Sequence, residues 1–184
     1  MKGTTVRKLY WNFENEERWL NEMAAKGQAL LHYSWGTYRF EPSRPAEWIY
    51  RIELLPDVAS KPASQEYLAF MADTGAQAVA TYQGWVYFRK ASVDGPFEVF
   101  SDLDSRIAHY KRVLILFASL FAALLPITIV NATNISRGEM TPVIFALALP
   151  VLILLLGVDA LLAVQALRVS GKVRELEVRK RLFE

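Results

Sequence analysis

The chain has 184 residues, with 21 lysines and arginines against 19 aspartates and glutamates, two histidines and no cysteine. This length suits one domain with an appended segment, and the lack of cysteine excludes disulfides, cysteine-ligated zinc, iron–sulfur clusters and a thiol nucleophile. Residues 1–112 carry equal numbers of basic and acidic side chains. The first part of the chain therefore lacks the basic surface that nucleic-acid binding requires.

The first hundred residues contain an internal repeat. Residues 19–40 align without a gap with residues 67–88 at an offset of 48, and six positions are identical. The matches fall on the apolar face of a helix, on the glycine that ends it and on a glycine between two alternating segments. The glycines are Gly27 and Gly36 in the first copy, and Gly75 and Gly84 in the second. A strand-like segment precedes each helix, so the pattern predicts a βαββ unit present twice, at about 5–41 and 48–90.

The predicted fold class is α+β, with two helices on an antiparallel sheet across residues 1–100. We expect hairpins that pair 29–35 with 37–41, and 77–83 with 85–90. Asn15 is the predicted N-cap of the first helix, where Glu16 and Glu17 suit the positive end of the helix dipole. Residues 101–112 are predicted to form a helical lead-in to the next segment, capped by Ser101 or Asp102.

Two apolar segments follow, at 113–133 and 143–167. The first has 21 residues without a charge, about 31 Å of helix, which is enough to cross a hydrocarbon core of about 30 Å. The second contains one charge, Asp159, and both are apolar all round, unlike the helices of a soluble pair. Residues 134–142 are a short loop, so the pattern predicts a transmembrane hairpin.

The charges beside these segments predict their orientation. Lys111 and Arg112 precede the first span, six basic side chains follow the second, and the loop carries Arg137 alone. By the positive-inside rule, we expect a two-span protein of the cell membrane with both termini cytoplasmic and residues 134–142 outside. The first residues lack the apolar region of a signal peptide, so the domain at 1–100 is expected to be cytosolic.

Aromatic side chains gather in the predicted domain, which holds all five tryptophans. Strand alternation places three pairs on single faces: Tyr33 with Trp35, Trp48 with Tyr50, and Trp85 with Tyr87. If these pairs share a sheet face left uncovered by the helices, they form a binding platform for a partner, a dimer mate or a small ligand. The alternative is cross-strand packing inside a thin core.

Asp159 is the one ionisable residue inside a predicted span. A carboxyl at that depth costs at least about 2.5 kcal/mol on insertion scales, so it normally has a partner. With no basic residue in the other span, the alternatives are another subunit, a water chain or its own proton. A hydrogen-bonded carboxyl that holds two helices together is the simpler interpretation.

The tail, residues 168–184, is basic. Its positive side chains predict contact with anionic lipid at the cytoplasmic face, and a short heptad pattern leaves a partner helix as the alternative. The candidate lipid-contact residues are Arg168, Lys172, Arg174, Arg179, Lys180 and Arg181.

No sequence motif points to catalysis. His32 and His109 have no nucleophile or ligand nearby in sequence, and the chain has no phosphate-binding loop, metal-spaced cluster or Gly-x-Ser-x-Gly. We therefore expect no catalytic residues, no metal, no cofactor and no enzyme activity.

Several motifs together resemble a bacterial family known as domain of unknown function number 2812. They are Trp11-x-Phe13-x-x-Glu16-Glu17-x-Trp19-Leu20-Asn21-Glu22-Met23-Ala24-Ala25-Lys26-Gly27, Tyr38-x-Phe40-Glu41, Tyr50-Arg51, Gly84-Trp85-x-Tyr87-Phe88-Arg89-Lys90 and Phe97-Glu98-x-Phe100-x-Asp102. The resemblance covers roughly residues 5–112. It implies a cytosolic domain joined to C-terminal membrane helices, encoded beside PadR-like regulators, with a regulated role in envelope stress or transport. It supplies no catalytic residues.

Two functions are compatible with these features. The first is a non-enzymatic, membrane-tethered binding or regulatory module, whose partners are membrane lipids, a protein or second copy, or a small ligand. The second is a small transport or pore subunit that oligomerises through the hairpin around Asp159.

Overall fold

The computed structural model describes residues 3–138 and 141–183 and divides into two compact units after Ser105. We call them the α+β unit, up to Ser105, and the helical unit, from Arg106. The first contains β1 (Thr4–Arg7), α1 (Phe13–Ala25), β2 (Gln28–Ser34), β3 (Thr37–Pro42), β4 (Trp48–Leu54), α2 (Pro62–Asp73), β5 (Gln77–Tyr82), β6 (Trp85–Ala91) and a short 3₁₀ turn (Ser92–Asp94). Two long helices follow, α3 (Leu103–Ser136) and α4 (Pro142–Phe183).

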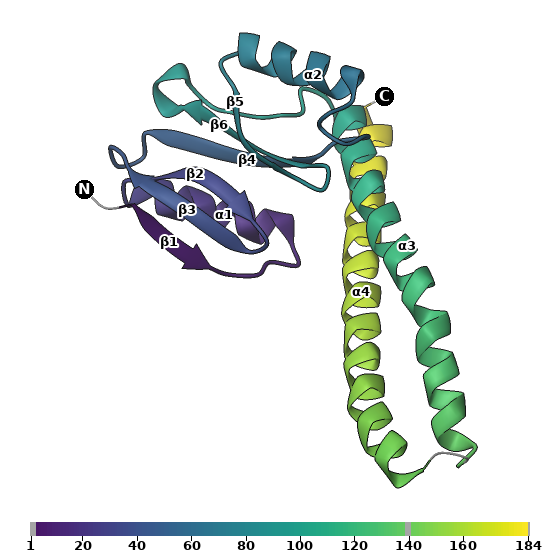
Figure 1. Ribbon diagram of the computed structural model, residues 1–184. Coiled ribbons are helices and arrows are strands. Elements are labelled where there is room, and N and C mark those ends of the chain that lie inside the picture. The colour runs from purple at the N-terminus through teal and green to yellow at the C-terminus, as the bar shows by residue number, and fades with distance from the viewer. Residues whose placement is uncertain (1–2, 139–140, 184) are drawn as a thin grey trace. The chain divides into compact units, whose positions relative to one another are not determined.

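The predicted α+β class is confirmed, but the strands form two antiparallel sheets of three strands where the sequence analysis expected one sheet (Figure 1). The first sheet has the order β1-β3-β2 and the second the order β4-β6-β5. In each, the last strand of a βαββ segment lies between the other two. The outer strands β2 and β5 pair with a neighbour on one side only.

The two sheets share the same type of hairpin turn and the same kind of strand irregularity. Each hairpin turns through two residues with positive φ, Trp35-Gly36 and Gln83-Gly84, as a type I′ turn requires. A register shift interrupts β2 near Leu31 and β5 near Val79. Such bulges bend a strand and increase its twist.

Alternation along β6 separates two cores. Tyr87 faces a first core that contains α1, the first sheet and one face of the second sheet. Val86 and Phe88 face a second core, which contains Met71 of α2 and Phe97 of the following segment. The second sheet is therefore covered on both faces, and Figure 1 shows α2 on the side away from the first sheet.

The N-cap prediction for α1 was wrong. Asn12 is the cap, since its Oδ1 accepts hydrogen bonds from the backbone N–H groups of Glu14 (2.8 Å) and Asn15 (3.1 Å). The helix therefore starts three residues earlier than Asn15 would allow, and Glu16 lies a full turn inside it.

The helical unit consists of α3 and α4, each long and apolar enough to cross a membrane. Only 11% of the most apolar window of each helix is buried, whereas a core helix of a soluble protein would be mostly buried. Lys111 pairs with Glu177 at 2.7 Å, and Thr128 bonds to Asp159, so contacts join the two helices at two levels. Before α3, Asp102 Oδ1 accepts from the N–H of Ser105 at 2.7 Å, as a cap does.

Candidate functional site: a buried carboxyl among tyrosines

Helix α1 carries a carboxyl on its buried face. Glu16, Leu20 and Ala24 are its buried residues, and their spacing of four places them along one stripe. Leu20 and Ala24 pack in the first core. Glu16 is only 7% exposed, although an apolar residue in its place would avoid the cost of burying a polar group.

The Glu16 carboxyl joins the two sheets. Its Oε1 accepts hydrogen bonds from the hydroxyls of Tyr38 on β3 (2.6 Å) and Tyr87 on β6 (2.7 Å). Burial raises the pKa of Glu16, although the two tyrosine hydrogen bonds oppose this. Burial and the adjacent Glu16 charge also raise the pKa of both tyrosines, so they remain protonated donors. One oxygen of Glu16 thus links α1 to β3 and to β6, through tyrosines that lie 22 and 71 residues further along the chain.

A third tyrosine covers this group. The ring of Tyr33 on β2 lies 4.7 Å from the rings of both Tyr38 and Tyr87, measured between centroids. Tyr33 is partly exposed, whereas Tyr38 and Tyr87 are buried. We call Glu16, Tyr33, Tyr38 and Tyr87 the Glu16 cluster.

A line of rings leads from the cluster to the surface. Tyr82 on β5 lies 5.6 Å from Tyr33, and Trp35 lies 6.3 Å from Tyr82. Trp35 is 77% exposed and has a φ of 46°, which is unusual for a bulky side chain. The rings connect solvent to the cluster across the junction of the outer strands β2 and β5.

The structure places the six predicted aromatic residues in two kinds of environment. Tyr50 and Tyr87 are buried in the first core, and Tyr33, Trp48 and Trp85 pack against it. The hydroxyl of Tyr50 accepts from the N–H of Leu30 at 2.7 Å. Trp35 alone projects from a hairpin tip. These side chains therefore surround one interior and do not form a flat exposed sheet face.

Sequence reasoning missed the central member of this site. Glu16 was attributed to the helix dipole, and Tyr38 was not among the candidate residues. The available signal was the position of a glutamate in the same stripe as Leu20 and Ala24. The approach of Tyr38 and Tyr87 to one oxygen depends on how the two sheets pack, which local patterns do not encode.

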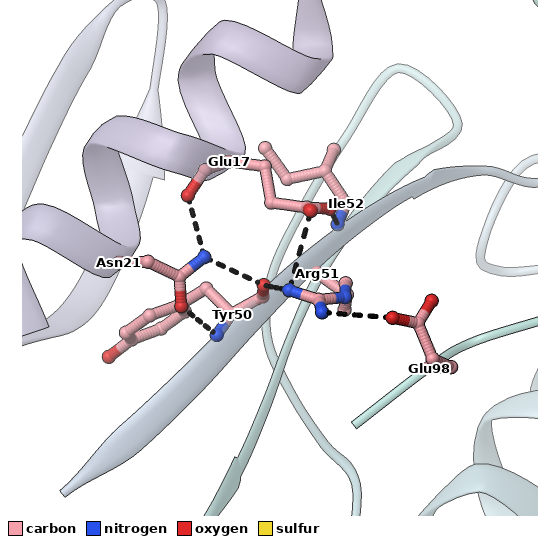
Figure 2. A network of polar contacts seen from close by, with 6 residues as sticks. All are labelled: Glu17, Asn21, Tyr50, Arg51, Ile52 and Glu98. Atoms are coloured by element: carbon pink, nitrogen blue, oxygen red, sulfur yellow. Dashed lines mark hydrogen bonds and ion pairs between the residues drawn. The ribbon is translucent and has the colours of Figure 1, made fainter. Parts of the chain in front are cut away.

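A second polar network lies on the neighbouring side of α1 and protects the outer strand β4 (Figure 2). Asn21 Oδ1 accepts from the N–H of Tyr50 (2.9 Å), and its Nδ2 donates to the Tyr50 carbonyl (3.1 Å). Glu17 Oε2 accepts from the N–H of Ile52 at 3.0 Å. The helix thus forms hydrogen bonds with backbone N–H and C=O groups of β4 that would otherwise be free to pair with another strand.

Arg51 extends this network beyond α1. Its guanidinium lies 3.4 Å from Glu17 Oε1 and 3.2 Å from Glu98 Oε1, as Figure 2 shows. Glu98 belongs to the segment between β6 and α3, and its neighbour Phe97 is buried in the second core. This segment is therefore held against the rest of the α+β unit by the apolar contacts of Phe97 and by the ion pair of Glu98 with Arg51 on β4.

Asp159 has a partner within the chain. Its Oδ2 accepts from the hydroxyl of Thr128 on α3 at 2.5 Å, and the residue is 6% exposed. Its Oδ1 is buried without a hydrogen-bond partner among the described residues. The other predicted span has no basic residue to pair with Asp159, and the sequence gives no signal that Thr128 is its partner.

The candidate lipid-contact residues all lie on the last part of α4, which continues without a break from the apolar segment. Lys172 also pairs with Glu175 at 3.0 Å on the same helix. Val173 and Leu176 on the same segment are buried, so one of its sides is not open to solvent.

Across residues 3–138 and 141–183, no group of three or more histidine, aspartate or glutamate side chains is placed to hold a metal ion. His32 is exposed on β2, and His109 is buried in α3.

Comparison with known proteins gives one match. The family described as "Protein of unknown function (DUF2812)" matches residues 12–122, which is more than half of the chain and confirms the resemblance seen in the motifs. The matched range includes every strand of the two sheets except β1, together with the first part of α3. No curated protein and no solved structure gives a significant match.

Proposed function

The chain belongs to the protein family of unknown function DUF2812, and from its structure we propose that it is a membrane-tethered binding protein whose α+β unit takes a small ligand at the Glu16 cluster. The observation that carries this proposal is the carboxyl of Glu16 in the first core, bonded to two tyrosine hydroxyls beneath a partly exposed ring.

Stability alone does not account for this arrangement. A carboxyl in an apolar stripe pays a desolvation cost that a leucine would avoid, and buried polar groups are often replaceable by apolar ones without loss of stability. Polar groups placed among aromatic side chains are the usual composition of small-molecule sites. The ring of Tyr33 and the exposed ring of Trp35 supply the apolar surface for such a ligand.

The helical unit supplies the tether in this proposal. Helices α3 and α4 have the length and composition to cross a membrane twice, and the charges beside them favour cytoplasmic termini. The α+β unit then lies in the cytoplasm, and the basic end of α4 contacts anionic lipid. The protein acts without catalysis, as a regulatory module linked to envelope stress or transport.

Native mass spectrometry of the full chain, gently extracted from its own membranes, tests this function. We expect wild type to retain a small molecule that a Tyr33→Ala variant loses, with circular dichroism unchanged. Ser34→Ala, at the adjacent position on β2, is the matched control and should retain the molecule. Equal retention by all three proteins, or its absence from wild type, would contradict binding at this site.

A second candidate function rests on Asp159. Its buried Oδ1 without a hydrogen-bond partner is a position where a proton, an ion or another subunit could bind, as in a small transport or pore subunit. Asp159→Asn should then change oligomer size or ion flux in vesicles. If neither changes, Asp159 serves only to hold α3 and α4 together through Thr128.

A further inference from the structure

We propose that the Glu16 cluster selects a flat organic cation, whose charge pairs with the Glu16 carboxylate and whose body stacks on Tyr33. This inference rests on the proposed function and specifies its ligand class. Glu16 is the only member of the cluster that can carry a negative charge while its tyrosines remain protonated donors.

The carboxylate has no cation of its own. Among the residues that the structure describes, no lysine, arginine or histidine forms an ion pair with Glu16, whose polar contacts are the hydroxyls of Tyr38 and Tyr87. Buried charges are normally paired with an opposite charge. Two neutral donors stabilise the anion but supply no positive charge, so a positive ligand would complete the pairing of the ionised form.

Other aromatic rings that pack against the first core already hold cationic side chains of this chain. Lys8 places its Nζ 4.7 Å from the ring of Tyr10 and 5.0 Å from Trp19, and the Arg89 guanidinium lies 4.2 Å from Trp48. These rings pack against the first core, as Tyr33 does. Cation–π attraction therefore operates at its edge, and Tyr33, Tyr38 and Tyr87 offer the same chemistry beside Glu16.

Access to Glu16 is provided at the junction of the two sheets. Strands β2 and β5 are outer strands that do not pair with each other, and both contain a bulge in this region. Tyr33 lies on this junction, is partly exposed and contacts the rings of both Tyr38 and Tyr87. In the proposal, movement of this one side chain gives the ligand access to the two buried tyrosines. Bulges are over-represented beside active sites, where they redirect a side chain or end the pairing of a strand.

Trp35 gives an independent reason to place a ligand here. Its left-handed backbone favours glycine or asparagine in a hairpin turn, and its exposed ring gains little from burial. Gln83 occupies the equivalent turn position in the second sheet without a large ring. A tryptophan in this unfavourable backbone conformation is explained if its ring, which lies beside Tyr82, is the first part of the site that a flat ligand contacts.

The test compares two probes that share a flat ring system and differ in charge, the cation 1-methylquinolinium and the neutral 1-methyl-2-quinolone. Affinities are measured by calorimetry on the full chain in nanodiscs, with empty nanodiscs as the blank. We expect wild type to bind the cation roughly ten- to a hundredfold more tightly than the neutral probe. Glu16→Gln keeps an oxygen acceptor for both tyrosines and should bring the two affinities to the same level.

Two controls keep this test specific. Glu22→Gln removes the same charge from an exposed position of α1 and should leave the preference for the cation unchanged. If Glu16→Gln is misfolded by circular dichroism, the wild type at acidic pH serves in its place, because protonation of Glu16 should weaken cation binding and leave the neutral probe unaffected.

Three outcomes would overturn the proposal. Equal affinity of wild type for the two probes would show a site that does not select charge, and the proposed binding function would stand without it. An unchanged cation preference in Glu16→Gln would place the selecting charge elsewhere. No binding of either probe would leave Glu16 as a structural link between the sheets, and retention of a molecule in native mass spectrometry would then decide the proposed function separately.

Discussion

Replacing Asn21 with alanine should destabilise the α+β unit by about 2 kcal/mol. Asn21 makes both of its contacts to β4 with the backbone of Tyr50, at 2.9 and 3.1 Å. Each such bond contributes about 1 kcal/mol net, and an unpaired buried N–H costs about 1–3 kcal/mol. The Tyr50 carbonyl keeps a bond from Arg51 Nη1, so the cost falls mainly on the N–H. The better helix propensity of alanine returns roughly 0.5 kcal/mol.

Urea unfolding of the full chain in detergent measures this effect. All five tryptophans precede residue 113, so their fluorescence follows the α+β unit while the helical unit stays in the micelle. A loss of about 2 kcal/mol lowers the urea midpoint by roughly 1 M. Asn15→Ala, at an exposed position of the same helix, is the matched control and should change stability by less than about 0.5 kcal/mol. An Asn21→Ala variant as stable as this control would refute the role of Asn21 at the strand edge.

Three further predictions concern separate parts of the chain. Burial raises the pKa of Glu16 in the folded state above 4.5, so the folded protein binds the proton of this carboxyl more tightly than the unfolded chain does. The urea midpoint should therefore rise as the pH falls from 7.5 towards 5, and it should rise less in Glu16→Gln. Trp35→Asn should stabilise the unit by roughly 1 kcal/mol in the same assay, because asparagine tolerates a φ of 46° better, and a loss of stability would show that the Trp35 ring packs productively. Thr128→Val should destabilise the hairpin by about 1 kcal/mol in unfolding by sodium dodecyl sulfate followed by circular dichroism, and adding Asp159→Leu should restore stability if the Thr128–Asp159 bond is the cause.

The sequence contained enough to predict the elements but not how the two sheets meet. The two positive-φ glycines of the hairpins, Gly36 and Gly84, and the apolar stripe of α1 are local signals, and the structure has hairpins and helices there. The strands form two sheets because β2 and β5 do not pair with each other, and this is decided by tertiary packing. Asn15 directly precedes two glutamates, which favours it as the cap in the sequence, whereas Asn12 has the extended backbone geometry that a cap requires.

The two polar sites were missed for different reasons. The position of Glu16 in a buried stripe was readable, but a glutamate in the first turns of a helix has an adequate explanation in the helix dipole. The bond between Thr128 and Asp159 joins residues 31 positions apart, and threonine is too common in apolar helices to mark a partner. In both cases the sequence shows the polar residue, and only the packed structure shows what it contacts.

Glu16 and Glu17 provide a comparison within one helix that bears on the ligand. Burial is the main cause that raises the pKa of both carboxyls. Glu17, directed towards β4, has Arg51 at 3.4 Å and the N–H of Ile52, so its charge is balanced within the chain. Glu16, one residue earlier, is directed towards the first core, and its polar contacts among the described residues are two neutral hydroxyls. Since β4 provides a cation, Arg51, for the partly buried Glu17 and no cation pairs with its neighbour among the described residues, the unbalanced charge of Glu16 is a property of that position rather than of the helix. A site that serves only to hold the sheets together would gain from the same pairing, whereas a site that receives a cation must leave its carboxylate without one.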